Sequence, residues 1–189
     1  MRPRQPSIPR LWLMTDERLG DDWPGGGLWT ALARLPRGAG VVFRHHATPP
    51  AERRRLLAKV ARLCRARRLV LVTAGARRHD GRVGTHGRPG AVTWPAHDRR
   101  EAIAGLRAGA RVLFVSPVFA TRSHPGAPAL GPVRAALIVR GLPAVTIALG
   151  GMDARRFRRL RPLGFDGWAA IDAWQAAKPA ASPPLPRPA

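Results

Sequence analysis

Residues 91–118, AVTWPAHDRREAIAGLRAGARVLFVSPV, contain the repeating unit from which we predict the fold. Two apolar runs, AVTWPAH and RVLFVSPV, flank a segment in which apolar residues recur with the 3.6-residue period of a helix. Asp98 stands where a helix N-cap is expected, and Gly109 follows the segment, where glycine often closes a helix. Both runs are mostly continuous rather than alternating, which is typical of parallel strands buried on both faces. This stretch therefore predicts a strand, a helix and a second parallel strand.

The same pattern recurs along the chain. Apolar runs occupy residues 11–15, 40–45, 69–74, 82–86, 91–97, 111–118, 144–151 and 167–172. Amphipathic segments follow several of these runs, at residues 49–68, 98–109, 131–141 and 153–164. These units predict an α/β fold, a small (β/α)₈ TIM barrel, with an open flavodoxin-like sheet as the alternative. The connections around the third to fifth runs are too short for full helices, so we expect that side of the barrel to be trimmed.

The chain of 189 residues is predicted to form one domain, since domains usually contain about 100–200 residues. Residues 11–174 carry all the strand and helix signals. Residues 1–10 are expected to form a flexible arm. Residues 175–189, QAAKPAASPPLPRPA, are rich in Pro and Ala and are expected to be disordered.

The formal net charge is +22, and nearly all of the positive charge is arginine, with lysine only at positions 59 and 178. Dense positive charge often indicates binding to nucleic acid, because phosphates then release their counterions. Here the abundance of Ala, Gly, Pro and Arg and the absence of Asn and Tyr are typical of a GC-rich genome. We therefore interpret the charge as coding bias with a solvated basic surface, and we do not expect nucleic acid as a partner.

The cellular location is predicted from what the chain lacks. No run approaches the roughly 20 apolar residues that span a bilayer, and the apolar stretch near the N-terminus is too short for a signal peptide. Cys64 is the only cysteine, which excludes an internal disulfide and fits a reducing compartment. We expect a soluble, cytoplasmic protein without a membrane partner; the oligomeric state stays open.

Polar residues gather at the carboxyl ends of the predicted strands, where barrels of this type carry their active sites. They are Thr15 and Asp16, residues 44–46, residues 73–75, His86, His97, residues 121–124, Gly150 and Gly151, and Asp172. Gly150 and Gly151 precede a segment that opens with an Asp N-cap, so backbone N–H groups could bind a phosphate there; a tight turn is the alternative. Thr121, Arg122, Ser123 and His124 form a long polar loop that could bind an anion, or a simple surface turn.

His97 ends a predicted strand and precedes a predicted helix, which places an imidazole at the mouth of the barrel as a candidate acid and base. Capping of the helix is the alternative role. Strand side chains alternate between faces, so only some of His45, His46 and His86 can point to the mouth. No histidine pair has the spacing of a metal site.

Residues 117–131, PVFATRSHPGAPALG, resemble the PVFxTxTKPGAPPLG loop of thiamine-phosphate synthases and their TenI-type thiazole tautomerase relatives. Weaker matches keep the same order along the chain: LWLMTD for YLVTD, VVFRHH for VQLRxK, WPAHD for VSxHN, VTIALGGM for VVAIGGI, and GFDGWAAIDAW for GADGVAVVSAI. The resemblance implies a (β/α)₈ barrel that binds a small phosphorylated substrate, a thiazole phosphate. In the synthases it also implies a hydroxymethylpyrimidine diphosphate with Mg²⁺, joined to the thiazole with loss of pyrophosphate.

The chain departs from the synthase motifs at several positions. Val42 and His46 replace Gln and Lys, while Arg44 is kept; Thr73 and Ala74 replace the Asn-Asp that contacts substrate and metal. Further replacements are His124 for Lys, Pro95 for Ser and Asp172 for Ser. An alanine cannot supply the oxygen ligand that Mg²⁺ needs, so we predict that the metal site, and with it any cofactor, is lost.

The resemblance then implies a division of roles among the candidates. His97 matches the histidine that moves a proton on the thiazole ring in tautomerases. The predicted phosphate- and substrate-binding residues are Arg44, His46, Thr121, Arg122, Ser123, His124, Gly150 and Gly151. The hypotheses are an enzyme of thiamine biosynthesis, either a tautomerase or a divergent synthase, or a catalytically silent phosphate-binding barrel. A basic nucleic-acid binder is the least favoured.

Overall fold

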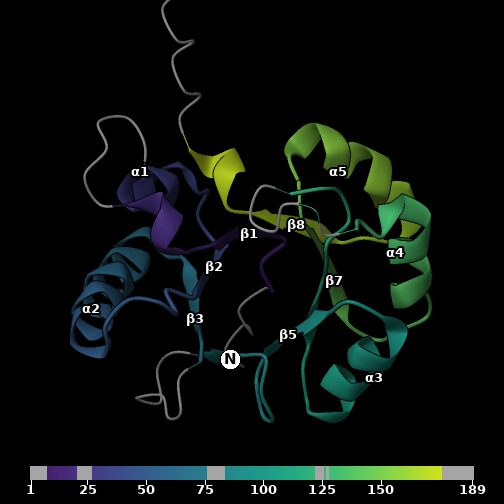
Figure 1. The fold of residues 1–189 in the computed structure, drawn as a ribbon, viewed down its shortest axis with the longest axis horizontal. Coiled ribbons are helices and arrows are strands. Elements are labelled where there is room, and N and C mark those ends of the chain that lie inside the picture. The colour runs from purple at the N-terminus through teal and green to yellow at the C-terminus, as the bar shows by residue number, and fades with distance from the viewer. Residues whose placement is uncertain (1–7, 21–26, 76–83, 122–125, 127, 176–189) are drawn as a thin grey trace, which may run out of the picture.

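The structure is a computed structural model that describes residues 8–20, 27–75, 84–121, 126 and 128–175. Eight parallel strands form one closed barrel, in which each strand pairs with the next along the chain (Figure 1). The strands are β1 (Leu11–Met14), β2 (Gly40–Phe43), β3 (Val70–Ala74), β4 (Gly84–His86), β5 (Thr93–Ala96), β6 (Val112–Val115), β7 (Val145–Leu149) and β8 (Gly167–Ala170). The ring closes where Leu11 of β1 pairs with Trp168 of β8. The predicted barrel is confirmed, and the open sheet is excluded.

Helices surround the strands. They are α1 (Gly27–Arg34), α2 (Pro50–Arg67), α3 (Arg99–Arg107), α4 (Gly131–Val139) and α5 (Ala154–Leu160), with short 3₁₀ turns η1 (Glu17–Leu19), η2 (Arg161–Leu163) and η3 (Asp172–Trp174). Helices α2 to α5 lie within the four predicted amphipathic segments. Asp98 and Asp153 cap α3 and α5, since each carboxylate accepts the backbone N–H three residues later at 2.7 Å. Among the described residues, no helix is both long enough and apolar enough to span a membrane.

The trimmed side of the barrel is the one predicted. The chain passes from β4 to β5 through residues 87–92 without a helix, and this side lies at the bottom of Figure 1, between β3 and β5. Residues 76–83, which precede β4, lie outside the described residues, as do most of the predicted arm and tail. Ile8 packs against the core, and the carbonyl of Pro9 accepts a hydrogen bond from the indole of Trp12.

The interior of the barrel is filled at the amino-terminal ends of the strands. Trp12 is 1% exposed and meets Phe114 edge to face, with the ring centroids 5.2 Å apart. Gly40 leaves room for the indole of Trp12, because a Cβ at position 40 would lie 2.1 Å from the indole ring. The indole of Trp12 therefore fills the interior of the barrel beside the first residue of β2. Cys64 of α2 lies outside the ring of strands and is buried there. Its burial raises the pKa of the thiol to about 12.

Candidate active site

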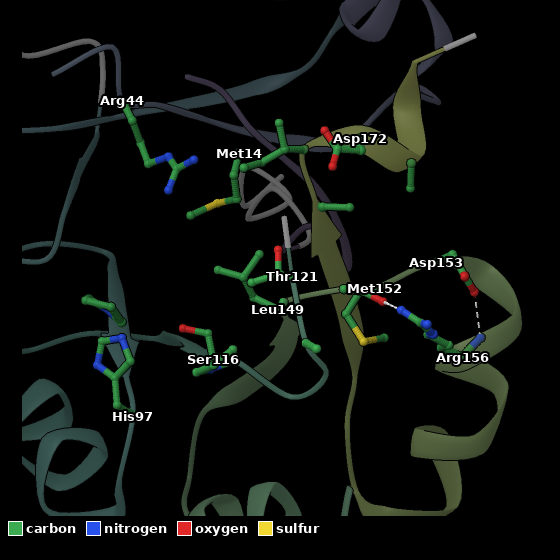
Figure 2. A pocket seen from close by; sticks show the side chains of 18 of the residues that line it. Met14, Arg44, His97, Ser116, Thr121, Leu149, Met152, Asp153, Arg156 and Asp172 are labelled. Carbon is green, nitrogen blue, oxygen red and sulfur yellow. Dashed lines mark hydrogen bonds between the residues drawn. The ribbon is translucent and has the colours of Figure 1, made fainter. Parts of the chain in front are cut away.

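A cavity of about 640 Å³ opens at the carboxyl ends of the strands. Its polar wall is formed by side chains from several strands and loops: Arg44, His86, His97, Ser116, Thr121, Arg156 and Asp172. Apolar side chains, including Met14 and Leu149, lie between them. In Figure 2, Arg44 and His97 lie on one side of the cavity, and Asp153 and Arg156 on the other. A ligand in this space would contact different chemical groups at its two ends.

Five of the nine predicted site residues line this cavity: Arg44, His97, Thr121, Gly150 and Gly151. Arg122, Ser123 and His124 lie outside the described residues, so their predicted roles stay predictions. His46 does not line the cavity; its side chain is exposed and faces Gly75.

The turn after β7 brings two loops together. Gly150 has φ +93°, a conformation that favours glycine, and a Cβ there would lie 2.7 Å from the Cα of Pro117. The backbone N–H of Phe119 donates to the carbonyl of Gly150 at 3.1 Å, which fixes the loop after β6 against this turn. Thr121 therefore lines the same cavity as the glycines. Backbone and hydroxyl groups together suit an anion.

Arg156 is part of this end of the cavity and was not predicted from the sequence. Its backbone N–H is held by the Asp153 carboxylate at 2.7 Å, and its guanidinium donates to the carbonyl of Gly151. The same guanidinium lies 5.0 Å above the ring of Phe119. The sequence feature that could have identified Arg156 as a site residue is its position three residues after the capping Asp153, in the turn that follows the glycines.

Arg44 reaches the other side of the cavity from the loop after β2. Its Nε donates to the carbonyl of Thr15 at 2.9 Å, and its Nη2 donates to the Asp16 carboxylate at 3.1 Å. Burial lowers the pKa of this guanidinium, while the charge of Asp16 acts in the opposite direction. The two partners fix the orientation of the Arg44 side chain in the cavity before any ligand binds.

His45 and His46 diverge because of the backbone between them. His45 has φ +40° and is buried, with its ring stacked on Phe43 at 4.7 Å. Its Nδ1 lies 2.9 Å from the hydroxyl of Thr15, so His45 joins the core and His46 points outward. Only His86 and His97, of the histidines in the described residues, line the cavity.

Arg53 of α2 holds the loop after β2 in place. Its guanidinium donates to the carbonyl oxygens of Arg44, His45 and Ala74 at 2.7–3.1 Å, and it lies 5.1 Å from the centre of the Phe43 ring. These bonds join α2 to the ends of β2 and β3. The position of Arg44 in the cavity therefore depends on Arg53.

We expect Arg53→Ala to lower the free energy of unfolding by about 2–3 kcal/mol, because carbonyls bonded to a cation lose their donor. Urea unfolding followed by circular dichroism measures this change. The matched control is Arg54→Ala, which removes the same charge from an exposed position and should change stability by less than about 0.5 kcal/mol. Equal losses in the two variants would show that only helix charge or propensity had been changed.

His97 is oriented by a carboxylate. Its Nδ1 lies 2.8 Å from Oε2 of Glu101, and its backbone N–H donates to the same oxygen. Glu101 is in turn fixed at the start of α3 by the cap from Asp98. The side chain of His97 is 58% exposed, at the rim of the cavity. The two predicted roles are compatible: the backbone joins the cap, while Nε2 stays available to a ligand.

His86 at the end of β4 has a different environment. Its Nδ1 lies 2.8 Å from the hydroxyl of Thr93 on β5, and its ring meets Phe114 edge to face at 5.5 Å. Burial lowers its pKa to about 4, and the positive charges of Arg44 and His46 act in the same direction. This imidazole is therefore neutral at physiological pH.

Part of the chain matches the model of a known protein family. The family model described as thiamine monophosphate synthase, TMP-TENI, matches residues 82–174. Residues 82–174, about half of the chain, are therefore similar to the thiamine monophosphate synthase family. The family resemblance read from the sequence is confirmed. None of the curated proteins matches the chain.

Two solved structures that are similar to this chain share its fold. The thiamine phosphate pyrophosphorylase from Pyrococcus furiosus aligns with a TM-score of 0.70 and 21% identity, over 87% of this chain and 86% of that chain. The native KDPGal structure aligns with a TM-score of 0.55 and 13% identity, over 84% of this chain and 81% of that chain. At these identities the likeness shows the fold alone.

The thiamine monophosphate synthase family implies a Mg²⁺ site, and the residues present here do not fit one. Ala74, at the end of β3, has no side-chain oxygen, and the carboxylate of Asp16 is already bound by Arg18 and Arg44. Within the described residues, no three His, Cys, Asp or Glu side chains are grouped so that they could hold a metal ion. Hard cations such as Mg²⁺ need several oxygen ligands in a fixed geometry.

Proposed function

We propose that this barrel binds a thiazole phosphate and transfers a proton on its ring, as a thiazole tautomerase. The observation that carries the proposal is the composition of one cavity: an anion-binding turn at Gly150 on one side and the His97–Glu101 pair on the other. An isomerisation of this kind needs an anion site and one acid and base. It needs neither a second substrate nor a metal.

In the proposed complex, the phosphate is bound by backbone N–H groups around Gly150 and Gly151 and by the hydroxyl of Thr121. The phosphate thereby anchors the ring between the two sides of the cavity. Nε2 of His97 accepts a proton from a saturated ring carbon of a non-aromatic thiazole tautomer, and the electron pair of the broken C–H bond moves into the conjugated double bonds. The same nitrogen returns the proton to the carbon at the far end of that conjugated system, so the product is the aromatic isomer of the substrate. Glu101 stabilises the imidazolium that exists between the two transfers.

A divergent synthase is the second candidate function. It is supported by the family assignment, but it requires a diphosphate leaving group to be stabilised without the Mg²⁺ ligands. Arginines at the cavity, such as Arg44 and Arg156, would have to provide that charge. The third candidate is a silent binder that holds the same phosphate without turnover. Cytoplasmic location stays a prediction.

The test is calorimetric titration with carboxythiazole phosphate and with hydroxymethylpyrimidine diphosphate, each with and without Mg²⁺. Salt near 0.15 M suppresses nonspecific binding of anions to the basic surface, since the Debye length is then about 8 Å. We expect the thiazole phosphate alone to bind, without a Mg²⁺ requirement, and its non-aromatic tautomer to isomerise to the aromatic thiazole in an NMR assay. Binding of both ligands with coupling would support the synthase. Binding without isomerisation would support the silent binder, and binding of neither would refute the assignment to thiamine chemistry.

A further inference from the structure

We propose that His86 is a specificity residue of this cavity, whose Nε2 makes a hydrogen bond to the polar ring end of the ligand, away from the phosphate. This inference rests on the proposed function and names the group that recognises the heterocycle. β4, which carries His86, is three strands from β7, which leads into the Gly150 turn. A phosphate anchored at that turn would direct the ring of its ligand across the cavity.

The first observation is the unequal use of the two ring nitrogens of His86. Nδ1 is paired with the Thr93 hydroxyl at 2.8 Å. Nε2 has no hydrogen-bond partner among the described residues, although His86 lines the cavity. Nε2 is also not among the polar atoms that are sealed from solvent without a partner. It is therefore accessible to a ligand.

The second observation is that the ring is held in place before a ligand binds. Thr93 on β5 fixes the rotation of the imidazole, and Phe114 on β6 supports one of its edges. Both supports lie on strands of the barrel rather than on loops. A group fixed in this way forms a hydrogen bond without losing side-chain entropy on binding, which favours specificity.

The third observation is the charge of the surroundings. The Thr93 hydroxyl and the Phe114 ring contact His86, and burial keeps its imidazole neutral, with the charge of Arg44 acting in the same direction. Arg44 suits an anionic substituent, whereas a neutral imidazole suits an uncharged nitrogen, hydroxyl or N–H group. His86 thus adds a contact that an inorganic phosphate cannot make but a heterocyclic phosphate can.

Two substitutions test separately the contacts that the two ring nitrogens of His86 make. His86→Asn places an amide near the position of Nδ1, so it keeps the bond to Thr93 and loses the contact with the ligand. His86→Gln carries its amide to the position of Nε2, so it keeps a hydrogen-bonding group in the cavity. The affinities of both variants for carboxythiazole phosphate and for inorganic phosphate are measured by calorimetry, with unfolding curves as a check on folding.

We expect His86→Asn to weaken carboxythiazole phosphate about tenfold, the effect of one lost hydrogen bond, and to leave inorganic phosphate unchanged. His86→Gln should stay within about threefold of the wild-type affinity for both ligands. If His86→Asn binds the thiazole phosphate as wild type does, the inference is refuted while the proposed function stands. An equal loss for both ligands would assign His86 a structural role and refute it too. A wild-type protein that does not bind the thiazole phosphate would refute both.

A measurement on the free protein needs no ligand. The imidazole ¹⁵N shifts of His86 should show a neutral ring throughout pH 6–8, because its pKa lies near 4. A protonated ring in that range would refute the inference, since an imidazolium would act as a second anion contact. This outcome is independent of which compound the cavity binds.

Discussion

Replacing His97 by glutamine should slow isomerisation of the thiazole phosphate by about 10²–10⁴-fold, the usual contribution of a positioned acid and base. Glutamine keeps a hydrogen-bonding side chain but cannot accept and return a proton. The phosphate would still be bound by the turn at Gly150, so Kd should change by less than about threefold. Rates are measured by NMR at saturating substrate, and affinities by calorimetry.

Glu101→Gln is the partner experiment for His97. The amide preserves a hydrogen-bonding group next to Nδ1, which lies 2.8 Å from the carboxylate in the structure, but it removes the negative charge. We expect a smaller loss of rate, about tenfold, because the imidazolium is no longer stabilised by a charge. An unchanged rate in His97→Gln would remove His97 from the mechanism. A parallel loss of binding would instead mean that His97 anchors the ligand.

Substituting alanine for Gly150 should abolish binding of the thiazole phosphate and lower the free energy of unfolding by about 3–4 kcal/mol. Two costs add at this position. The residue has φ +93°, which a side chain disfavours, and a Cβ would lie 2.7 Å from the backbone of Pro117. The collision must displace the loop after β6, and with it Thr121, from the proposed anion site. Urea unfolding and calorimetry measure the two effects.

Gly109→Ala measures the cost of the backbone conformation without the cost of the close contact. Gly109 has nearly the same conformation, φ +92°, but a Cβ there would meet nothing within 4 Å. This variant should lose only about 1–2 kcal/mol, the cost of the backbone conformation, and should bind the ligand as wild type does. If the two variants were equally stable and both bound the thiazole phosphate, close contact between the two loops would not be needed for the site.

The elements that could be predicted are those with local signals. The strands at 111–118 and 144–151 and the helix capped by Asp98 follow from hydrophobic period and capping, which involve residues a few positions apart. Helix α1 was not predicted, since its eight residues follow a Gly-rich stretch and show little more than two turns of periodicity. The glycines of the β7 turn were also recognisable, because their role depends on backbone conformation rather than on distant partners.

The side chains of the site were harder to predict. His45 and His46 are adjacent, and nothing local indicated that a positive φ would turn the first into the core and the second outward. Arg53 resembles its neighbours Arg54 and Arg55 in sequence, yet only its hydrogen bonds to the loop after β2 and to the end of β3 make it structural. The neutral state of His86 results from burial and from charges on another strand's loop.

The amino-acid sequence by itself determined the eight-unit barrel, its trimmed side, its family and the turn that suits a phosphate. These depend on periodicity, caps, glycines and motif residues that lie close together in the chain. Only the tertiary structure decided which polar side chains line the cavity and in what state of charge. Closure of the ring pairs Leu13 of β1 with Ala170 of β8, and the strand order β2-β3-β4 places Arg44 and His86 at one cavity. Both arrangements depend on packing between strands that are separated in sequence.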